Sequence, residues 1–537
     1  MVETMSKANY GDLMNPINNE THLVRETHVG TICGKQWDDH TIAWLGVPYA
    51  KPPVHTLRWK APQDPLPWHD ILQTDQFSKP CMQYGGLLLK LDSDIIGQPV
   101  GCEDCLYLNI WRPNTTDINL PVILFIHGGL NVIGEAATSL YHGANLARKS
   151  NMIVITVNFR LGIFGWFACD VLKTGDPLDD SGNYGLLDII HALKWVQTNI
   201  NAFGGDQQNI TLMGESAGAF NIISLLASPL AKGLFHKAFA ISPIISLFSA
   251  PMSMGYHKAK KNIVRLLKKD KLAMSSKDAH KLIAQKGTSW CADYLRSKDA
   301  TELLLSTQKL SAFGVNDIGL TIDIFGGNRF SDGSVIPINF KETFQQGQTH
   351  PIPIIIGSTS DEMRIFEIAL GIFSKIDNYQ LCSLIQSFEP DTSQVNLSDV
   401  VPFYYQWIYQ FVGSSIGSLL FEKLGIDPIA NCLCQTQDVY VFKFTWHEMP
   451  PPFDFLIGAS HMTPLPFIFG NFQRDINSIF RFAWCKSNEI EREQLSDKIM
   501  AYLSNFARTG SPNAPEQNER PFWTPWKNEI QPNRFIL

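Results

Sequence analysis

The chain has 537 residues, of which 45% are hydrophobic and 18% charged, and its formal net charge is −7. This balance is typical of a folded protein with a large core and excludes a disordered or fibrous chain. Basic residues are scattered apart from two short groups between His257 and Lys271, so the sequence gives no sign of a nucleic-acid partner.

No stretch approaches the ~20 consecutive apolar residues that span a membrane, and the first twenty residues lack the apolar centre of a signal peptide. We therefore expect no membrane span and a cytoplasmic location, with secretion as the alternative if the N-terminus is incomplete. Ten cysteines are more than a reduced cytosolic protein needs. Four Asn-x-Ser/Thr sites matter only in a secreted chain, and chance accounts for that number; they are Asn19, Asn114, Asn209 and Asn396.

Short β-branched runs that each end in a turn predict the strands of a sheet. Their continuous hydrophobicity is typical of strands buried on both faces, as in a parallel sheet covered by helices. Apolar residues at helical spacing between Leu186 and Val196, and the segment after Ser216, predict helices between them. The alternation indicates a doubly wound α/β fold. The runs are residues 120–129, 151–162, 209–216, 236–242 and 350–360.

The domain organisation follows from what the sequence lacks. We find no internal repeat and no Pro/Gly/Ser linker long enough to separate two domains. Residues 23–537 are therefore predicted to form one domain, after a lead segment 1–22 that is poorly ordered at its start. Less regular, more helical stretches near 247–349 and 367–436 are interpreted as insertions over one end of the sheet.

The segment NITLMGESAGAF places Ser216 in a Gly-x-Ser-x-Gly motif between a predicted strand and a predicted helix. In that context the glycines leave room for strand and helix to pass, and the serine hydroxyl is exposed on a strained turn. The helix also directs its first N–H groups at the same point. Alone the motif is weak, because it occurs by chance in roughly one in five chains of this length.

Several stretches, in the family's order, resemble the type-B carboxylesterases, the family of α/β-hydrolases that includes the cholinesterases. They extend from about Trp44 to Asn513 and include WLGVPYAKPP, PVILFIHGG, ITLMGESAGAF, IPIIIGSTSDE and IGASHMTPLPFIFG. The resemblance implies an α/β-hydrolase fold and a serine carboxylesterase that cleaves neutral esters through an acyl-enzyme, without a cofactor or metal. The alternative is a non-catalytic adhesion-type protein, since the family also contains members that have lost the serine or another member of the triad.

The resemblance also assigns a catalytic triad, in the order serine, acid, histidine that is typical of the fold. Ser216 is the nucleophile, Glu362 in GSTSDE is the acid and His461 in GASH is the base. From the pattern alone Glu362 could be a solvated loop carboxylate, Asp361 is a rival acid, and His461 could be a buried structural histidine.

An oxyanion hole and a disulfide are implied in the same way. The backbone N–H groups of Gly129, Leu130 and Ala217 are the expected oxyanion donors. Leu130 stands where the HGG pattern suggests a further glycine; its N–H can still donate, but its side chain restricts φ and adds bulk beside the acyl group. Cys81 and Cys105 match a disulfide of many relatives, and Arg58 with Glu103 a buried ion pair. Cys102 and Cys105 also form a C-x-x-C pattern, but the sequence has no second pair at zinc-finger spacing.

The expected substrate pocket departs from that of the cholinesterases. Between Cys81 and Cys105 there is no tryptophan to hold a quaternary ammonium group, so a choline ester is excluded as the preferred substrate. Met462 and Pro464 follow the histidine where the family usually has a glycine and an acidic residue, which puts the level of activity in question. The sequence leaves open whether the protein is a monomer or a dimer. The expected pocket residues are Leu130, Glu215, Ile365, Phe366 and Met462.

Overall fold

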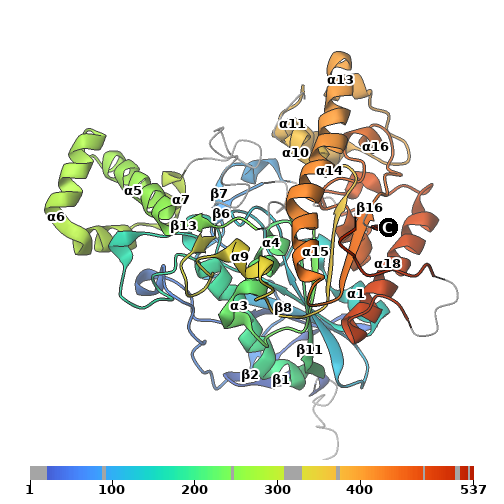
Figure 1. The fold of residues 1–537 in the computed structure, drawn as a ribbon, viewed down its shortest axis with the longest axis horizontal. Coiled ribbons are helices and arrows are strands. Elements are labelled where there is room, and N and C mark those ends of the chain that lie inside the picture. Colours follow the sequence, from blue (N-terminus) through green and yellow to red (C-terminus); the bar gives the residue numbers. More distant parts are fainter. Residues whose placement is uncertain are drawn as a thin grey trace, which may run out of the picture.

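The computed structural model describes residues 21–86, 92–243, 247–307, 329–369, 375–475, 478–514, 520–529 and 533–537. Of the predicted lead segment, residues 1–20 lie outside this range. The described chain forms a large twisted sheet between layers of helices, with helical excursions that project from the body (Figure 1).

The central sheet has ten strands and is mostly parallel, as predicted. Neighbouring strands run parallel from β10 to β17, while β8, β4 and β3 form an antiparallel edge that we did not predict. In spatial order they are β17 (Phe535–Ile536), β16 (Val439–Phe444), β15 (Ile354–Thr359), β12 (Lys237–Ile241), β11 (Gly205–Glu215), β9 (Leu120–Ile126), β10 (Ile153–Val157), β8 (Tyr107–Pro113), β4 (Thr41–Pro48) and β3 (Lys35–Asp38).

Both faces of the sheet are buried, which explains why the strands show no polar alternation. In β9, Val122 and Leu124 belong to one hydrophobic cluster, while Ile123 and Phe125 belong to the cluster on the opposite face. The first cluster includes residues of α3 (Tyr184–Asn199) and α4 (Ala217–Ala227), and the second includes residues of α1 (Ala144–Ser150), α17 (Pro464–Phe469) and α18 (Glu489–Thr509).

Where the structure describes them, the two less regular stretches of the sequence are largely helical. The first group projects on the left of Figure 1 and comprises α5 (Met252–Lys269), α6 (Ser276–Arg296), α7 (Ala300–Ser306) and, closer to the sheet, α9 (Phe340–Gln345). The second group rises from the middle of Figure 1 toward its upper right and comprises α10 (Arg364–Ala369), α11 (Asn378–Ser387), α12 (Leu397–Val400), α13 (Phe403–Gln410), the π-helical turn η8 (Phe411–Ile416), α14 (Gly417–Leu420), the π-helical turn η9 (Phe421–Ile426) and α15 (Asp427–Leu433).

Short elements complete the described fold. They are the small sheets β1 (Val24–Thr27), β2 (Gly30–Cys33) and β5 (Leu72–Gln73), β6 (Gln83–Tyr84) with β7 (Pro99–Val100), and β13 (Ala250–Pro251) with β14 (Phe330–Ser331), and the helices α2 (Gly162–Gly165) and α16 (Phe453–Leu456). Among the described helices, none combines the length and apolar character needed to cross a membrane.

Candidate active site

Ser216 sits on the sharp turn between β11 and α4. Its backbone has φ 56° and ψ −117°, a conformation that L-residues rarely adopt and that is typical of a nucleophile elbow. The turn requires both glycines of the motif: a Cβ on Gly214 would lie 2.6 Å from the carbonyl carbon of Gly218, and a Cβ on Gly218 would collide with the carbonyl oxygen of Ile126. The Ser216 amide donates to the carbonyl of Ile241 at 2.8 Å, which fixes the turn against the neighbouring strand.

His461 and Glu362 come together in the interior, where both are almost fully buried. The distance between His461 Nδ1 and Glu362 Oε2 is 2.7 Å. The other carboxylate oxygen, Oε1, accepts hydrogen bonds from Ser242 Oγ at 2.6 Å and from the Thr359 amide at 2.8 Å. With both oxygens engaged, the Glu362 carboxylate is held in one orientation toward the imidazole.

The rival acid, Asp361, has different partners. Its Oδ2 accepts from the Ala459 amide at 3.0 Å, and its Oδ1 accepts from Ser414 Oγ at 2.6 Å. Glu362 is therefore the residue of this pair that contacts His461.

A second carboxylate approaches the imidazole from the other side. Glu215 Oε1 lies 2.9 Å from His461 Nε2, within ion-pair distance but without hydrogen-bond geometry. Burial on its own lowers the pKa of His461, but the Glu215 and Glu362 carboxylates outweigh that effect and raise the pKa to about 10. Within the described residues, no hydrogen bond joins Ser216 Oγ to His461.

The loop that follows β9 carries two of the three expected oxyanion donors, Gly129 and Leu130. Gly129 has φ 99°, and a Cβ there would collide with the carbonyl oxygen of Ile133, so only glycine fits. Leu130 and Asn131 follow with φ 58° and 60°, two successive left-handed residues. The third expected donor, Ala217, begins α4, where the first N–H groups have no carbonyl partner within the helix.

Buried amide side chains hold this loop from outside. Gln83 Oε1 accepts from the Gly134 amide at 2.7 Å, and Gln83 Nε2 donates to the Gly134 carbonyl at 2.9 Å. Asn131 and Asn221 of α4 exchange hydrogen bonds through their side-chain amides at 2.9 and 3.2 Å. These contacts compensate the cost of the left-handed backbone, about 1–2 kcal/mol for each non-glycine residue.

Ser216 and His461 border a cavity with about 350 Å³ of empty space, part of it open to solvent. All of the predicted pocket residues line it, and so does Ile133, which we did not predict. Met462 has φ 73°, so a bulky side chain again occupies a left-handed position, here one where the family usually has glycine. The lining residues are Gly129, Leu130, Ile133, Glu215, Ser216, Ile365, Phe366, His461 and Met462.

Besides the approach of Glu215 to His461, three contacts of the triad were not predicted from the sequence. Ser242 and Thr359, the partners of Glu362, stand at the carboxyl ends of β12 and β15. Polar residues at neighbouring strand ends gather at one edge of a parallel sheet, so this signal was present. Phe421, whose ring centroid lies 5.5 Å from that of His461, comes from a π-helical turn and had no local signal.

Cys81 and Cys105 form the predicted disulfide, and Cys102 is not part of it. Arg58 Nη2 contacts Glu103 Oε2 at 2.5 Å, which is the predicted buried ion pair. In the part of the chain that the structure describes, no group of three or more His, Cys, Asp or Glu residues is arranged to hold a metal ion.

Residues 21–534 match the model of the carboxylesterase family. The chain is 31% identical to the para-nitrobenzyl esterase of Bacillus subtilis (strain 168) over 498 residues, which are 93% of this chain and 92% of that protein. It is 29% identical to the cocaine esterase of Homo sapiens, covering 95% of this chain and 87% of that protein. A carboxylesterase of Geobacillus stearothermophilus superposes with a TM-score of 0.69 at 27% identity, over 94% of each chain.

The chain therefore belongs to the carboxylesterase family, with the α/β-hydrolase fold. It is a carboxylic ester hydrolase, as the sequence predicted. The acylcarnitine hydrolase of Rattus norvegicus is a further relative, 30% identical over 94% of this chain and 86% of that protein. All of these relatives are named as esterases or hydrolases, so they give no support to the alternative of a non-catalytic binding protein.

Proposed function

We propose that Ser216, His461 and Glu362 form the catalytic triad of a serine esterase for neutral esters of alkyl or aryl groups. The observation that carries this proposal is the contact of 2.7 Å between His461 Nδ1 and Glu362 Oε2, beside a cavity that Ser216 also borders. With Nδ1–H donated to Glu362, the imidazole keeps Nε2 as the atom that accepts a proton.

Acyl transfer then proceeds in two halves. His461 Nε2 takes the Ser216 proton as Oγ attacks the ester carbonyl, and the imidazolium returns it to the departing alcohol. Water activated by His461 attacks the acyl-enzyme and releases the acid. The backbone N–H groups of Gly129, Leu130 and Ala217 stabilise the oxyanion in both halves, and loss of one such donor typically costs ~10²-fold in rate.

Glu215 opposes the first step in the conformation described. While Nε2 faces the Glu215 carboxylate, the pKa of about 10 keeps His461 protonated at neutral pH, and a protonated imidazole cannot accept the serine proton. We infer that Nε2 turns from Glu215 to Ser216 when substrate enters, and that the pKa of His461 falls as the first contact is lost.

The chemistry of the cavity favours neutral, compact substrates. Its side-chain walls are mostly apolar, and two bulky residues, Leu130 and Met462, line it beside Ser216 and leave less room for a long acyl group. The names of the relatives refer to alcohol or acyl parts as different as para-nitrobenzyl, cocaine and acylcarnitine, so they do not select one ester.

Hydrolysis of the nitrophenyl esters of acetate, butyrate and octanoate tests this proposal. We expect turnover by the wild type, with acetate or butyrate preferred, and a loss of about 10³-fold or more in Ser216→Ala. Equal rates in the two proteins would refute the assignment of Ser216, and a preference for octanoate would refute the compact acyl site.

A further inference from the structure

Asp361 joins the loop that carries the acid to the loop that carries the base. Its backbone amide donates to the carbonyl of Ala459 at 3.0 Å, and its Oδ2 accepts from the amide of the same residue at 3.0 Å. Asp361 directly precedes Glu362, and Ala459 stands two residues before His461. The two loops are thus tied in both directions, one residue away from the acid.

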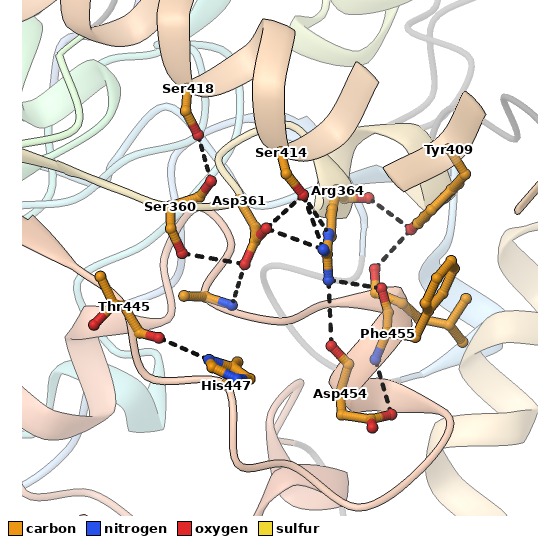
Figure 2. Close-up of polar contacts among 12 residues, drawn as sticks. Ser360, Asp361, Arg364, Tyr409, Ser414, Ser418, Thr445, His447, Asp454 and Phe455 are labelled. Carbon is orange, nitrogen blue, oxygen red and sulfur yellow. Dashed lines mark hydrogen bonds and ion pairs between the residues drawn. The ribbon is translucent and has the colours of Figure 1, made fainter. Parts of the chain in front are cut away.

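Arg364 extends this connection to the segment that leads to His461 (Figure 2). Its Nη2 lies 3.1 Å from Asp361 Oδ1, and its Nη1 donates to the carbonyl of Phe455 at 2.9 Å. Tyr409 OH donates to the carbonyl of Leu456 at 2.6 Å, and the carbonyl oxygen of Arg364 lies 3.2 Å from the same hydroxyl. The segment leading to His461 is therefore held at several successive points before it reaches the imidazole.

The helical segment from α13 to α14 supports the loop of Glu362 from the side opposite the loop of His461. Ser414 Oγ donates to Asp361 Oδ1 at 2.6 Å, and Ser418 Oγ donates to the carbonyl of Ser360 (Figure 2). Small residues permit the close approach: a Cβ on Gly413 would lie 2.6 Å from Arg364 Cγ, and one on Gly417 would collide with the side chain of Met363. The loop is packed between this helical segment and the loop of His461.

The ion pair at the centre of this network is buried. Asp361 is 8% exposed and Arg364 7% exposed, and both have hydrogen-bond partners besides each other. A buried charge pair with its hydrogen bonds satisfied fixes one arrangement strongly, because breaking it leaves an uncompensated charge inside the protein.

We propose that Asp361 is a positioning residue that holds Glu362 and His461 at hydrogen-bonding distance by joining their two loops. The inference rests on the proposed triad and assigns a task to the acidic residue that does not contact the imidazole. The 2.7 Å contact between His461 and Glu362 depends on the relative placement of the two loops, and a shift of about 1 Å between catalytic groups can cost ~10²-fold in rate.

The test compares Asp361→Ala, Asp361→Asn and Arg364→Met with the wild type on nitrophenyl butyrate, at several pH values. Asp361→Ala should lower kcat ~10- to 100-fold and change KM less than about threefold, because substrate contacts remain while the triad loses its alignment. Asp361→Asn, which keeps an acceptor for the Ala459 amide, should lose less than Asp361→Ala but at least about threefold. Asp391→Asn, which breaks the more exposed pair with Arg474, is the control and should keep wild-type kcat.

Arg364→Met separates positioning from simple electrostatics. It changes the local charge in the direction opposite to Asp361→Ala, so an electrostatic role would shift the pH profile of kcat/KM in opposite directions in the two variants. A positioning role instead predicts a lower kcat in both variants.

Wild-type kcat in Asp361→Ala, or in Asp361→Asn if the alanine variant does not fold, would overturn the inference. Activity that depends on Ser216 but not on Asp361 would overturn this inference alone, whereas a wild type that hydrolyses none of the esters would overturn the proposed function as well.

Discussion

Leu130 and Met462 place bulky side chains on a left-handed backbone, on two segments of the pocket wall. Their φ angles are 58° and 73°, and both residues line the cavity next to Ser216. Glycine adopts such angles without steric cost. Each of these two residues therefore adds backbone strain, and its side chain makes the pocket narrower than a glycine would. The leucine that follows HGG thus adopts the left-handed backbone of the loop and lines the cavity beside Ser216.

Leu130→Gly should broaden the acyl range. Removing the isobutyl group enlarges the cavity, and each methylene that becomes accommodated is worth ~10-fold or more in kcat/KM. We therefore expect the ratio of kcat/KM for octanoate to that for acetate to rise at least about 10-fold. Val132→Ala, on the same loop but not part of the cavity wall, is the matched control. An unchanged ratio would show that Leu130 does not face the acyl group.

Glu215 controls the protonation of His461. Because Glu215 and Glu362 raise the pKa of His461 to about 10 against the effect of burial, removing the Glu215 charge must lower that pKa. The base works only when neutral, so the acidic limb of kcat/KM in Glu215→Gln should move to lower pH, by about one unit or more. A pH profile of kcat/KM that coincides with that of the wild type would show that Glu215 does not set the pKa of His461. Glu448→Gln, which alters an exposed carboxylate, should leave the profile in place.

At the scale of elements, the segment that contains the disulfide supports the oxyanion loop. Gln83 stands two residues after Cys81 and holds the amide and the carbonyl of Gly134, at the end of the loop that begins with Gly129. Its side chain is fully buried, so nothing in solvent can replace these bonds.

Gln83→Ala should loosen the oxyanion loop and lower kcat ~10- to 100-fold with a smaller effect on KM, because the oxyanion forms only in the transition state. The oxyanion contribution can be isolated by comparing an ester with its thiono analogue, since sulfur is a poorer hydrogen-bond acceptor. The rate ratio between the two should shrink in Gln83→Ala and stay constant in Gln98→Ala, an exposed glutamine nearby. A constant ratio in both variants would refute the role of Gln83.

For the molecule as a whole, the sequence predicted those features that have a local physical signature. The continuous apolar strands and the glycines around Ser216 predicted the observed sheet and its nucleophile turn. The antiparallel edge, with β8 beside β10 and β4 beside β8, follows from pairing between distant segments and left no such signature.

The candidate active site also contains residues that the sequence could identify and contacts that it could not. Glu362 and His461 were assigned through family resemblance, because a loop carboxylate and a buried histidine look alike in any single sequence. Glu215 and His461 are 246 positions apart in the chain, and Asp361 and Ala459 are 98 positions apart. Their contacts depend on the directions of side chains from distant segments. Only the folded molecule brings those groups together.

Covalent labelling of the purified protein with a serine-directed alkyl phosphonate tests the central claim most directly. Mass spectrometry of the digested protein should find one phosphonyl group per chain, on the peptide that contains Ser216, with ester hydrolysis lost in proportion to labelling. His461→Ala should label at least about 10²-fold more slowly, because Ser216 then lacks its base. Label on another residue, or hydrolysis that persists in the fully labelled protein, would contradict the account.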